Sequence, residues 1–317
     1  MNDKDLLAQR FEADRDRLRA VAYRMLGSVS EAEDAVQEAW FKLSRSDASA
    51  VENLGGWLTT VVGRVCLDML RSRTSRREDS LDARVHLPDP VVQAPDQGAR
   101  TAADPEQQAL IADSVGLALL VVLETLGPAE RLAFVLHDMF GVSFDEIGPI
   151  VGRTPTAARQ LASRARRRVR GAAPEPERDA ARQRKAVDAF LAAARGGDFE
   201  GLLAVLDPDV LLRADGGSLR AVATTLVRGA RAVASQALMF SRAEAQGVPV
   251  LVNGNAGLLA IEAGSPSALL AFTVSEEGLI VEIDILVDPE RLERLDVGAL
   301  DTGTDKDTGT DTATPED

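Results

Sequence analysis

The chain has 317 residues, enough for about two domains of ordinary size, and a formal net charge of −14 from 36 basic and 50 acidic residues. Residues 185–317 hold 10 of the basic and 22 of the acidic residues, so the overall acidity does not exclude a nucleic-acid-binding surface nearer the N-terminus. The single cysteine, Cys66, excludes a disulfide framework and a multi-thiolate metal site, and only two histidines are present. No stretch has the apolar length of a membrane span or the pattern of a signal peptide, so we expect a cytoplasmic protein.

The N-terminal stretch, residues 6–77, is expected to be helical, because its apolar residues recur at spacings of three and four with few helix breakers. Ser30 followed by Glu33 has the pattern of a capping box and predicts the start of a helix. One side of this helix is apolar and predicts burial, with Ala32, Val36, Ala39, Trp40 and Leu43. The opposite side is acidic, with Glu31, Asp34, Gln37 and Glu38. Taken alone, such a side is more often a solvated surface than a binding site.

A second helix is expected to begin near Trp57, after a polar loop over residues 45–56. Its end is rich in cations, which we take as candidate DNA contacts: Arg64, Arg71, Arg73, Arg76 and Arg77. The helix dipole also favours a solvated cation cluster at this end, so both interpretations stay open from the pattern alone.

Residues 78–104 have the composition of an extended, mobile linker, because they include Pro88, Pro90, Pro95 and Gly98 among scattered acids. A second Pro-rich joint lies at 172–177, and an acidic Asp-Thr-Gly repeat ends the chain. These breaks predict five segments: a helical domain (1–80), a flexible linker (81–104), a helix-turn-helix domain (105–172), an α+β domain (178–297) and a disordered acidic tail (298–317).

The most informative pattern lies in residues 126–170. Ser143–Val151 predicts a short helix, Gly152-Arg153 a turn, and Thr154-Pro155 the N-cap and first residue of a second helix. At about 100° per residue, one side of the second helix is small and apolar, and the other is cationic or hydrogen-bonding without an acid. The candidate DNA contacts are Arg153, Thr154, Thr156, Arg159, Gln160, Ser163, Arg164 and Arg167. Arg and Gln read base edges, so the pattern favours a recognition helix over a solvated basic helix.

Residues 178–297 begin with helical segments and continue with strand-like runs punctuated by Gly and Pro. The runs are 210–213, 248–252, 257–262, 268–274 and 279–286. Helices followed by a mainly antiparallel set of strands predict an α+β fold. Acids such as Glu282 and Asp284 form no diagnostic catalytic pair, and no histidine lies beyond His137. We therefore expect no enzymatic activity, no cofactor and no metal ion, and interpret Asp215-Gly216-Gly217 first as a turn.

Three motifs in order resemble the extracytoplasmic-function (ECF) sigma factors of bacterial RNA polymerase. They are Ser-x-x-Glu-Asp-Ala-Val-Gln-Glu-Ala-Trp (30–40), Gly-Trp-Leu-Thr-Thr-Val-Val-Gly-Arg-Val-Cys-Leu-Asp-Met-Leu-Arg (56–71) and the helix-turn-helix (126–170). The resemblance spans about residues 8–172.

This resemblance implies a role for each helical part. The helix 30–45, with Asp34, Gln37 and Glu38, would dock on core RNA polymerase. Residues 46–77 would melt and hold the minus-ten element, with the 46–56 loop near an unstacked base. The helix-turn-helix would read the minus-thirty-five element.

The rest of the chain is similar to the SigJ-like subgroup of this family, in which a SnoaL-like domain, a cone of curved sheet and helices, is fused at the C-terminus. His86-Leu87-Pro88-Asp89-Pro90 resembles the subgroup's Trp-Leu-Pro-Glu-Pro motif, and Asp215-Gly216-Gly217 the start of its Asp-Gly-Gly motif. Asp288-Pro289-Glu290-Arg291-Leu292 resembles its Asn-Pro-Asp-Lys-Leu motif. The resemblance implies that these three segments regulate the DNA-binding domains in cis, in place of a separate anti-sigma protein.

The sequence thus predicts two all-α domains followed by an α+β SnoaL-like domain, acting as a sigma subunit with core RNA polymerase and promoter DNA as partners and no membrane. The acidic third domain or tail, tethered beside Arg-rich helices, would favour a closed state. One alternative is a stand-alone helix-turn-helix regulator that senses a small ligand, which leaves residues 30–77 without a role. A SnoaL-like enzyme on a DNA-binding module is the other, and the lack of histidine disfavours it.

Overall fold

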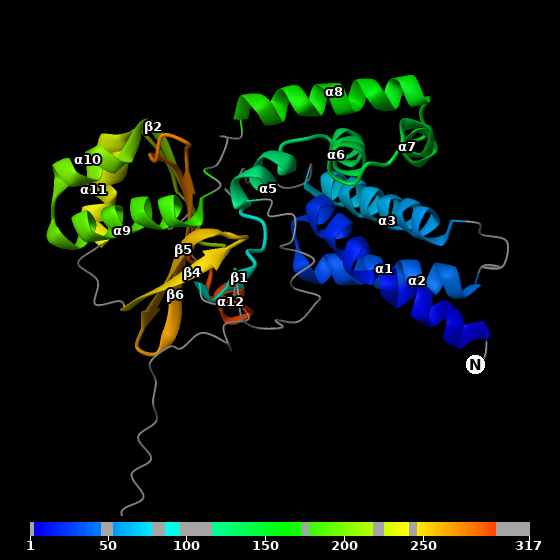
Figure 1. Cartoon of the computed structure of the whole chain (residues 1–317), viewed down its shortest axis with the longest axis horizontal. Helices are drawn as coiled ribbons and strands as arrows, with labels where there is room; N and C mark the ends of the chain where they lie inside the picture. Colours follow the sequence, from blue (N-terminus) through cyan, green and yellow to red (C-terminus); the bar gives the residue numbers. More distant parts are fainter. Residues whose placement is uncertain are drawn as a thin grey trace, which may run out of the picture.

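The chain folds as two helical units followed by a unit built on a β-sheet, as the computed structural model in Figure 1 shows. The described residues are 3–45, 53–77, 86–95, 116–172, 177, 179–217, 225–240 and 246–295. This order confirms the predicted fold class, all-α parts followed by an α+β part. The predicted acidic tail lies outside the described residues.

Three helices form the first unit: α1 (Asp3–Leu26), α2 (Val29–Arg45) and α3 (Leu54–Arg77). The apolar side of α2 is buried as predicted, except that Trp40 is half-buried and packs on Phe11 with ring centroids 5.0 Å apart. α3 begins three residues before Trp57, because the Asn53 side chain accepts a hydrogen bond from the Gly56 N–H at 3.0 Å and caps the helix there.

The predicted start of α2 at Ser30 is wrong by two residues. Ser28 stands before the helix, where its carbonyl accepts a hydrogen bond from Ala32 at 3.0 Å and its hydroxyl one from Glu31 at 3.5 Å. The Val29 N–H donates to the Asp89 carboxylate at 3.2 Å. A side chain 60 residues away therefore satisfies a first-turn N–H, which the local pattern could not show.

The second unit consists of α5 (Leu117–Glu124), α6 (Pro128–Phe134), the π-helical turn η3 (Val135–Met139), α7 (Phe144–Val151) and α8 (Pro155–Ala172). Ser143 and Glu146 form a capping box at the start of α7, and Gly152 ends α7 with a φ of +68°. The Thr154 hydroxyl accepts from the Ala157 N–H at 3.2 Å and caps α8. The predicted short helix, glycine turn and capped second helix are confirmed.

The third unit carries α9 (Ala180–Gly196), α10 (Phe199–Val205), α11 (Ala230–Phe240) and α12 (Pro289–Glu293). Its sheet contains β2 (Leu206–Asp215), β3 (Thr225–Arg228), β4 (Gln246–Val252), β5 (Asn255–Glu262), β6 (Ser265–Val274) and β7 (Ile280–Leu286). The full strand order is β1-β4-β5-β6-β7-β2-β3, where β1 comes from the linker. β2 and β7 are parallel, and the other described neighbouring strands are antiparallel. The sheet is therefore mainly antiparallel, as the sequence predicted.

The two faces of this sheet have different partners. Phe272 of β6 and Ile283 of β7 pack in a core with α9, α10 and α11. Leu269, Ala271 and Leu286, which point the other way, belong to the same core as the helical units. Because side chains alternate along a strand, one face closes the third unit and the other joins it to the rest of the protein.

Part of the predicted mobile linker is a fixed element of the fold. β1 (Val92–Gln93) pairs antiparallel with β4, with Val92 opposite Val252 and Gln93 opposite Leu251. The prediction of a mobile spacer is wrong for residues 86–95. The reason is that the apolar residues Leu87, Val91 and Val92, which lie close to the prolines in the sequence, are buried, and an edge position tolerates nearby proline.

The two helical units also contact each other directly, because α3 lies against α6 and α7 (Figure 1). Gly63 of α3 lies at this contact. A Cβ built on Gly63 would be 3.4 Å from Leu136, 3.6 Å from Leu132 and 3.9 Å from Ile150. The missing side chain lets the backbone of α3 approach the second unit closely.

Candidate functional site

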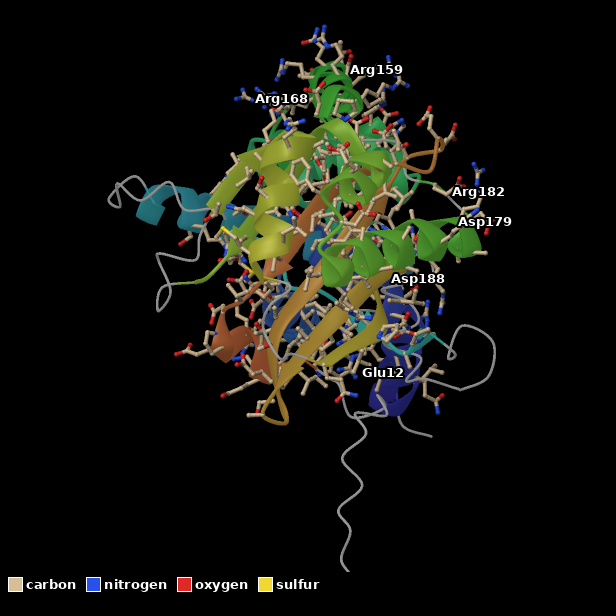
Figure 2. All side chains as sticks on the ribbon, turned by 90° about the vertical axis from the view of Figure 1, so that its left-hand side faces the viewer. Glu12, Arg159, Arg168, Asp179, Arg182 and Asp188 are labelled. Carbon is tan, nitrogen blue, oxygen red and sulfur yellow. The ribbon has the colours of Figure 1, made fainter. Side chains whose placement is uncertain are left out.

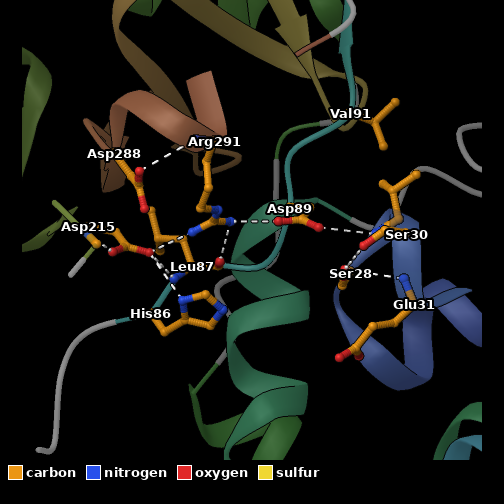
Figure 3. Close-up of polar contacts among 12 residues, drawn as sticks. Ser28, Ser30, Glu31, His86, Leu87, Asp89, Val91, Asp215, Asp288 and Arg291 are labelled. Carbon is orange, nitrogen blue, oxygen red and sulfur yellow. Dashed lines mark hydrogen bonds and ion pairs between the residues drawn. The ribbon is translucent and has the colours of Figure 1, made fainter. Parts of the chain in front are cut away.

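Three segments that are far apart in the sequence meet where the linker, the sheet and the first helical unit adjoin (Figure 3). They are the linker motif 86–90, the turn 215–217 after β2 and the start of α12 at 288–291. The sequence singled out all three as candidate regulatory segments. The structure brings all three together.

Asp215 is the buried acid of this site, with a side chain that is 2% exposed. Its Oδ2 accepts a hydrogen bond from the Leu87 N–H at 2.8 Å and lies 3.4 Å from His86 Nδ1. Its Oδ1 accepts from the Gly217 N–H at 3.0 Å. Burial raises the pKa of Asp215, but the hydrogen bonds from His86, Leu87 and Gly217 and the charge of Arg291 outweigh burial and lower it to about 2.

Arg291 of α12 links Asp215 to the linker. Its Nη1 donates to Asp215 Oδ2 at 2.8 Å, and its Nη2 donates to the Leu87 carbonyl at 2.7 Å and to Asp89 Oδ1 at 3.0 Å. A planar guanidinium suits this fork of acceptors, because its donors have a fixed geometry. We call Asp89, Asp215 and Arg291 the latch.

The latch continues into the first helical unit through Asp89. Its second carboxylate oxygen accepts from the Val29 N–H of α2, and its carbonyl accepts from the Tyr23 hydroxyl at 2.6 Å. The same hydroxyl accepts from Asn253 Nδ2 at 3.0 Å. Burial raises the pKa of Tyr23 well above its usual range, so the phenol keeps its proton for Asp89. Asp89 thus connects α2 to the third unit.

The remaining motif residues support this geometry. The Asp288 side chain caps α12, in which Pro289 is the first residue. Gly217 has a φ of +61°, a backbone conformation that favours glycine. A side chain at this position would also collide with the Asp288 carboxylate, so glycine is required both by the backbone conformation and by the space available. Asp215-Gly216-Gly217 is the turn expected from the sequence, and its first residue is also a buried partner of the linker. Pro88 and Pro90 are buried beside the latch.

The sequence pointed to the segments but missed three residues of the site. Arg291 lies within the C-terminal motif, where a cation among acids was the available signal. Tyr23, the chain's one tyrosine, lies on the apolar side of α1 and gave no polar signal. Asn253 sits in the β4–β5 turn with a φ of +50° and reads as an ordinary turn residue.

On α2, Asp34, Gln37 and Glu38 are exposed, as a docking surface requires. Glu31 differs from them, because it is half-buried and paired with Arg73. The four residues of the acidic side therefore do not form one continuous surface, and only Asp34, Gln37 and Glu38 face outward.

Of the predicted DNA-contacting cations of α3, some are exposed and one is turned inward. Arg64 and Arg71 are exposed, the latter 3.7 Å from Asp68. Arg73 is turned inward, where it donates to the Leu26 carbonyl at 3.0 Å and pairs with Glu31 of α2. The side chains of Arg76 and Arg77 lie outside the described residues.

All eight candidate contacts of the helix-turn-helix, from Arg153 to Arg167, are exposed, while Ala158, Ala162 and Ala165 of α8 are buried. Arg159 also lies 5.3 Å over the ring of Phe144. Figure 2 shows Arg159 and Arg168 at the end of the molecule that α8 forms. The outer side of α8 carries no acid of its own, but Glu130 of α6 pairs with Arg164.

Two strand acids lie on the sheet face opposite the core with α9–α11. Glu282 and Asp284 of β7 both accept hydrogen bonds from Arg213 of β2, at 2.8 Å each. Burial, and to a lesser extent the charge of Glu282, raise the pKa of Asp284, whereas Arg213 lowers it, and the net pKa is about 6. Asp284 lies beside Leu87 and Pro90. These acids therefore face the linker and are engaged with an arginine.

Within the described residues, no group of three or more His, Cys, Asp or Glu side chains is placed to hold a metal ion. None of the helices, over the part of the chain the structure covers, is long and apolar enough to cross a membrane.

Comparison with known proteins gives matches over most of the chain. The family models of Sigma-70 region 2 and Sigma-70 region 4 match residues 10–76 and 116–169. The chain is 35% identical over 297 residues to the probable ECF RNA polymerase sigma factor SigI of Mycobacterium tuberculosis, covering 93% of this chain and 98% of that protein. It is 40% identical over 267 residues to the ECF RNA polymerase sigma factor SigJ of the same species, covering 81% of each.

A solved structure matches as well. The crystal structure of M. tuberculosis SigJ superposes with a TM-score of 0.69 at 34% identity, covering 90% of this chain and 97% of that chain. The match therefore extends beyond the two helical units into the third.

Proposed function

The chain belongs to the ECF sigma factors of RNA polymerase, and from this premise we propose that its third unit holds the two DNA-binding units closed in cis. A sigma factor binds core RNA polymerase and directs it to promoter DNA. The observation that carries the proposal is the latch, in which Arg291 joins Asp215 of the sheet to Asp89, and Asp89 caps α2.

The promoter sets a distance that the closed arrangement does not meet. The minus-ten and minus-thirty-five elements lie about 25 base pairs apart, or about 85 Å of DNA at 3.4 Å per base pair. At 1.5 Å per residue, α3 is about 36 Å and α8 about 27 Å long, so even end to end they fall short. Because α3 touches α6 and α7 here, both units cannot occupy their elements until they separate.

The chain between the units is long enough for that separation. The 39 residues from 78 to 116, fully extended at about 3.3 Å each, reach about 130 Å. Residues 86–95 of this stretch are held by β4 and by the latch in the closed arrangement. Release of this linker from the third unit would therefore free the second unit to move to its own DNA element.

Closure within one chain needs no second protein, since the third unit is always present at high effective concentration. We therefore propose that the fused unit takes the place of a separate anti-sigma factor for this protein.

The exposed residues complete the proposal. The exposed face Asp34, Gln37 and Glu38 of α2 would dock on core polymerase, and Arg64 and Arg71 of α3 would contact the minus-ten DNA. The exposed face of α8 would read the minus-thirty-five element. If Arg159 or Gln160 reads a base, its substitution by Ala costs about 1–3 kcal/mol of discrimination at one base step. An equal loss on all sequences would instead make it a phosphate contact.

Run-off transcription with core polymerase tests the cis regulation. We compare the full chain, a chain ending at residue 300 and a chain ending at residue 175, each on the same promoter. We expect the chain ending at residue 175 to differ from the two longer chains, because it lacks both Asp215 and Arg291. Equal activity at all three lengths would rule out regulation by the third unit or the tail. Co-purification with core polymerase serves as the control that each chain is folded enough to bind.

A further inference from the structure

Two arginines in the second half of α8 are held by one acid from another helix. Oε1 of Glu130, in the first turn of α6, lies 2.8 Å from Nε of Arg164, and its Oε2 lies 2.9 Å from Nη1 of Arg168. The Glu130 side chain is 14% exposed, against 49% for Arg164 and 57% for Arg168. The acid is therefore behind the two arginines, and the guanidinium groups form the surface.

This arrangement leaves donors of both guanidinium groups open to solvent. Glu130 uses the Nε of Arg164 and one Nη of Arg168, whereas each guanidinium carries five N–H donors. No other described residue accepts a hydrogen bond from either group. Arg166 is braced in the same way, with its Nε 2.5 Å from Oδ1 of Asp138 in η3. Arg164 and Arg168 are four residues apart and lie on one side of α8.

We propose that Glu130 is a positioning residue that presents Arg164 and Arg168 to DNA phosphates beside the minus-thirty-five element. Arg168 thereby becomes a DNA contact that the sequence pattern did not include. The inference rests on the proposed role of α8 as the recognition helix. In such a helix the N-terminal residues meet base edges, which leaves the later residues for the flanking backbone.

The ion pairs with Glu130 would strengthen DNA binding by ordering the two arginine side chains before they meet the DNA. A free arginine loses side-chain entropy when a phosphate fixes it, whereas an arginine already held by a carboxylate has lost much of it before binding. The outer N–H groups of a braced guanidinium keep the paired geometry that suits phosphate oxygens.

Positioning and simple charge repulsion predict opposite signs for the same substitution. Glu130→Gln removes a negative charge close to the DNA. If charge alone mattered, the variant would bind DNA more tightly. If Glu130 positions two phosphate-binding arginines, the variant binds about three- to tenfold more weakly. The dependence of log affinity on log salt should also become shallower, by about 0.9 for each phosphate that the variant no longer neutralises.

The experiment measures affinity of the reconstituted holoenzyme for its promoter across a range of salt concentrations. The variants are E130Q, R164A, R168A, the double variant R164A/R168A, and that double variant combined with E130Q. Asp145→Asn is the matched control, because Asp145 is an exposed acid of the adjacent helix α7. We expect D145N to leave the salt slope unchanged, and E130Q to have no further effect once both arginines are absent. Thermal melting of each variant separates a folding defect from a binding defect.

Each result has one meaning. Tighter or unchanged binding by E130Q, with R164A and R168A still weakening it, overturns the positioning role and leaves the recognition helix intact. Unchanged affinity and salt slope in R164A and R168A would instead overturn the placement of this half of α8 on DNA, and the inference with it. A loss that appears equally in D145N would show that it does not depend on Glu130.

Discussion

Two of the contacts that the first helical unit makes with the rest of the protein differ in chemistry. One is the latch, where Asp89 accepts from the backbone of α2 and is held by Arg291. The other is the apolar contact of α3 with α6 and α7, around Gly63. The latch requires the third unit, whereas the apolar contact lies within the two helical units.

Because of this difference in chemistry, we expect the two contacts to have different roles in the opening of the protein. Hydrogen-bonded charges are directional, and the loss of one partner leaves the others buried and unpaired, so the latch is sensitive to a single change. Apolar burial is non-directional and roughly proportional to area, so it holds the units together without specifying a trigger. We therefore expect the latch to control opening and the apolar contact to set how far the closed state is favoured once the latch is broken.

The largest expected effect comes from Arg291→Ala. It leaves Asp215 buried without its cation, which should destabilise the closed arrangement by about 3 kcal/mol. Hydrogen exchange of the Leu87 and Val29 amides reports this directly, because both donate to the latch carboxylates. Arg294→Ala on the same helix is the control, since Arg294 is exposed and pairs with Glu290. Equal protection in both variants would mean that Arg291 does not hold the latch.

A smaller effect is expected from the buried acid that faces the linker. The pKa of Asp284 is about 6 in the folded protein, above the value of about 3.9 in an unfolded chain. Folding thus favours the protonated form of Asp284. The contribution of Asp284 to the free energy of unfolding is complete below pH 4 and is lost as pH rises through 6.

Asp284→Asn should remove this pH dependence. Between pH 4 and 7 we expect the free energy of unfolding of the natural chain to fall by about 2 kcal/mol relative to that of D284N. Urea unfolding at several pH values measures the difference. Asp209→Asn, at an exposed position of β2, is the control. Parallel pH profiles for D284N and the natural chain would contradict the burial of an acid beside the linker.

The smallest effect is expected at the apolar contact. Gly63→Leu adds a side chain where Leu132 and Leu136 already fill the space, and overpacking costs about 1–3 kcal/mol. Removing a glycine from a helix interior offsets about 1 kcal/mol of this, so a net loss near 1 kcal/mol is expected. Gly171→Leu of α8, where nothing lies within 4 Å, is the control for thermal melting. A higher melting temperature for G63L than for G171L would show that the contact has room.

Local patterns predicted what local chemistry decides. Ser143, Gly152 and Thr154 were assigned correctly because capping and a left-handed turn depend on a few neighbouring residues. Ser30 was assigned wrongly because the true start of α2 is fixed by Asp89, 60 residues away.

The same limit explains the linker and the latch. Proline-rich composition predicts a mobile spacer, and only the edge of β4 turns residues 92–93 into a strand. The motif segments around Asp215 and Asp288 were found by resemblance, but their meeting at Arg291 depends on the packing of the sheet against the helical units. The exposure of α8 was predictable from its period, whereas the pairing of Arg164 with Glu130 required the placement of α6.

The central claim is that the third unit keeps the two DNA-binding units together until the protein engages polymerase. Energy transfer between dyes at the exposed positions Arg17 of α1 and Gly171 of α8, each replaced by cysteine, measures their separation in the full chain. Cys66 is buried and does not compete for labelling. We predict efficient transfer in the free protein, a large drop on binding core polymerase, and a drop without polymerase in the Arg291→Ala variant. Transfer that is equally low in the free and polymerase-bound protein would contradict closure in cis.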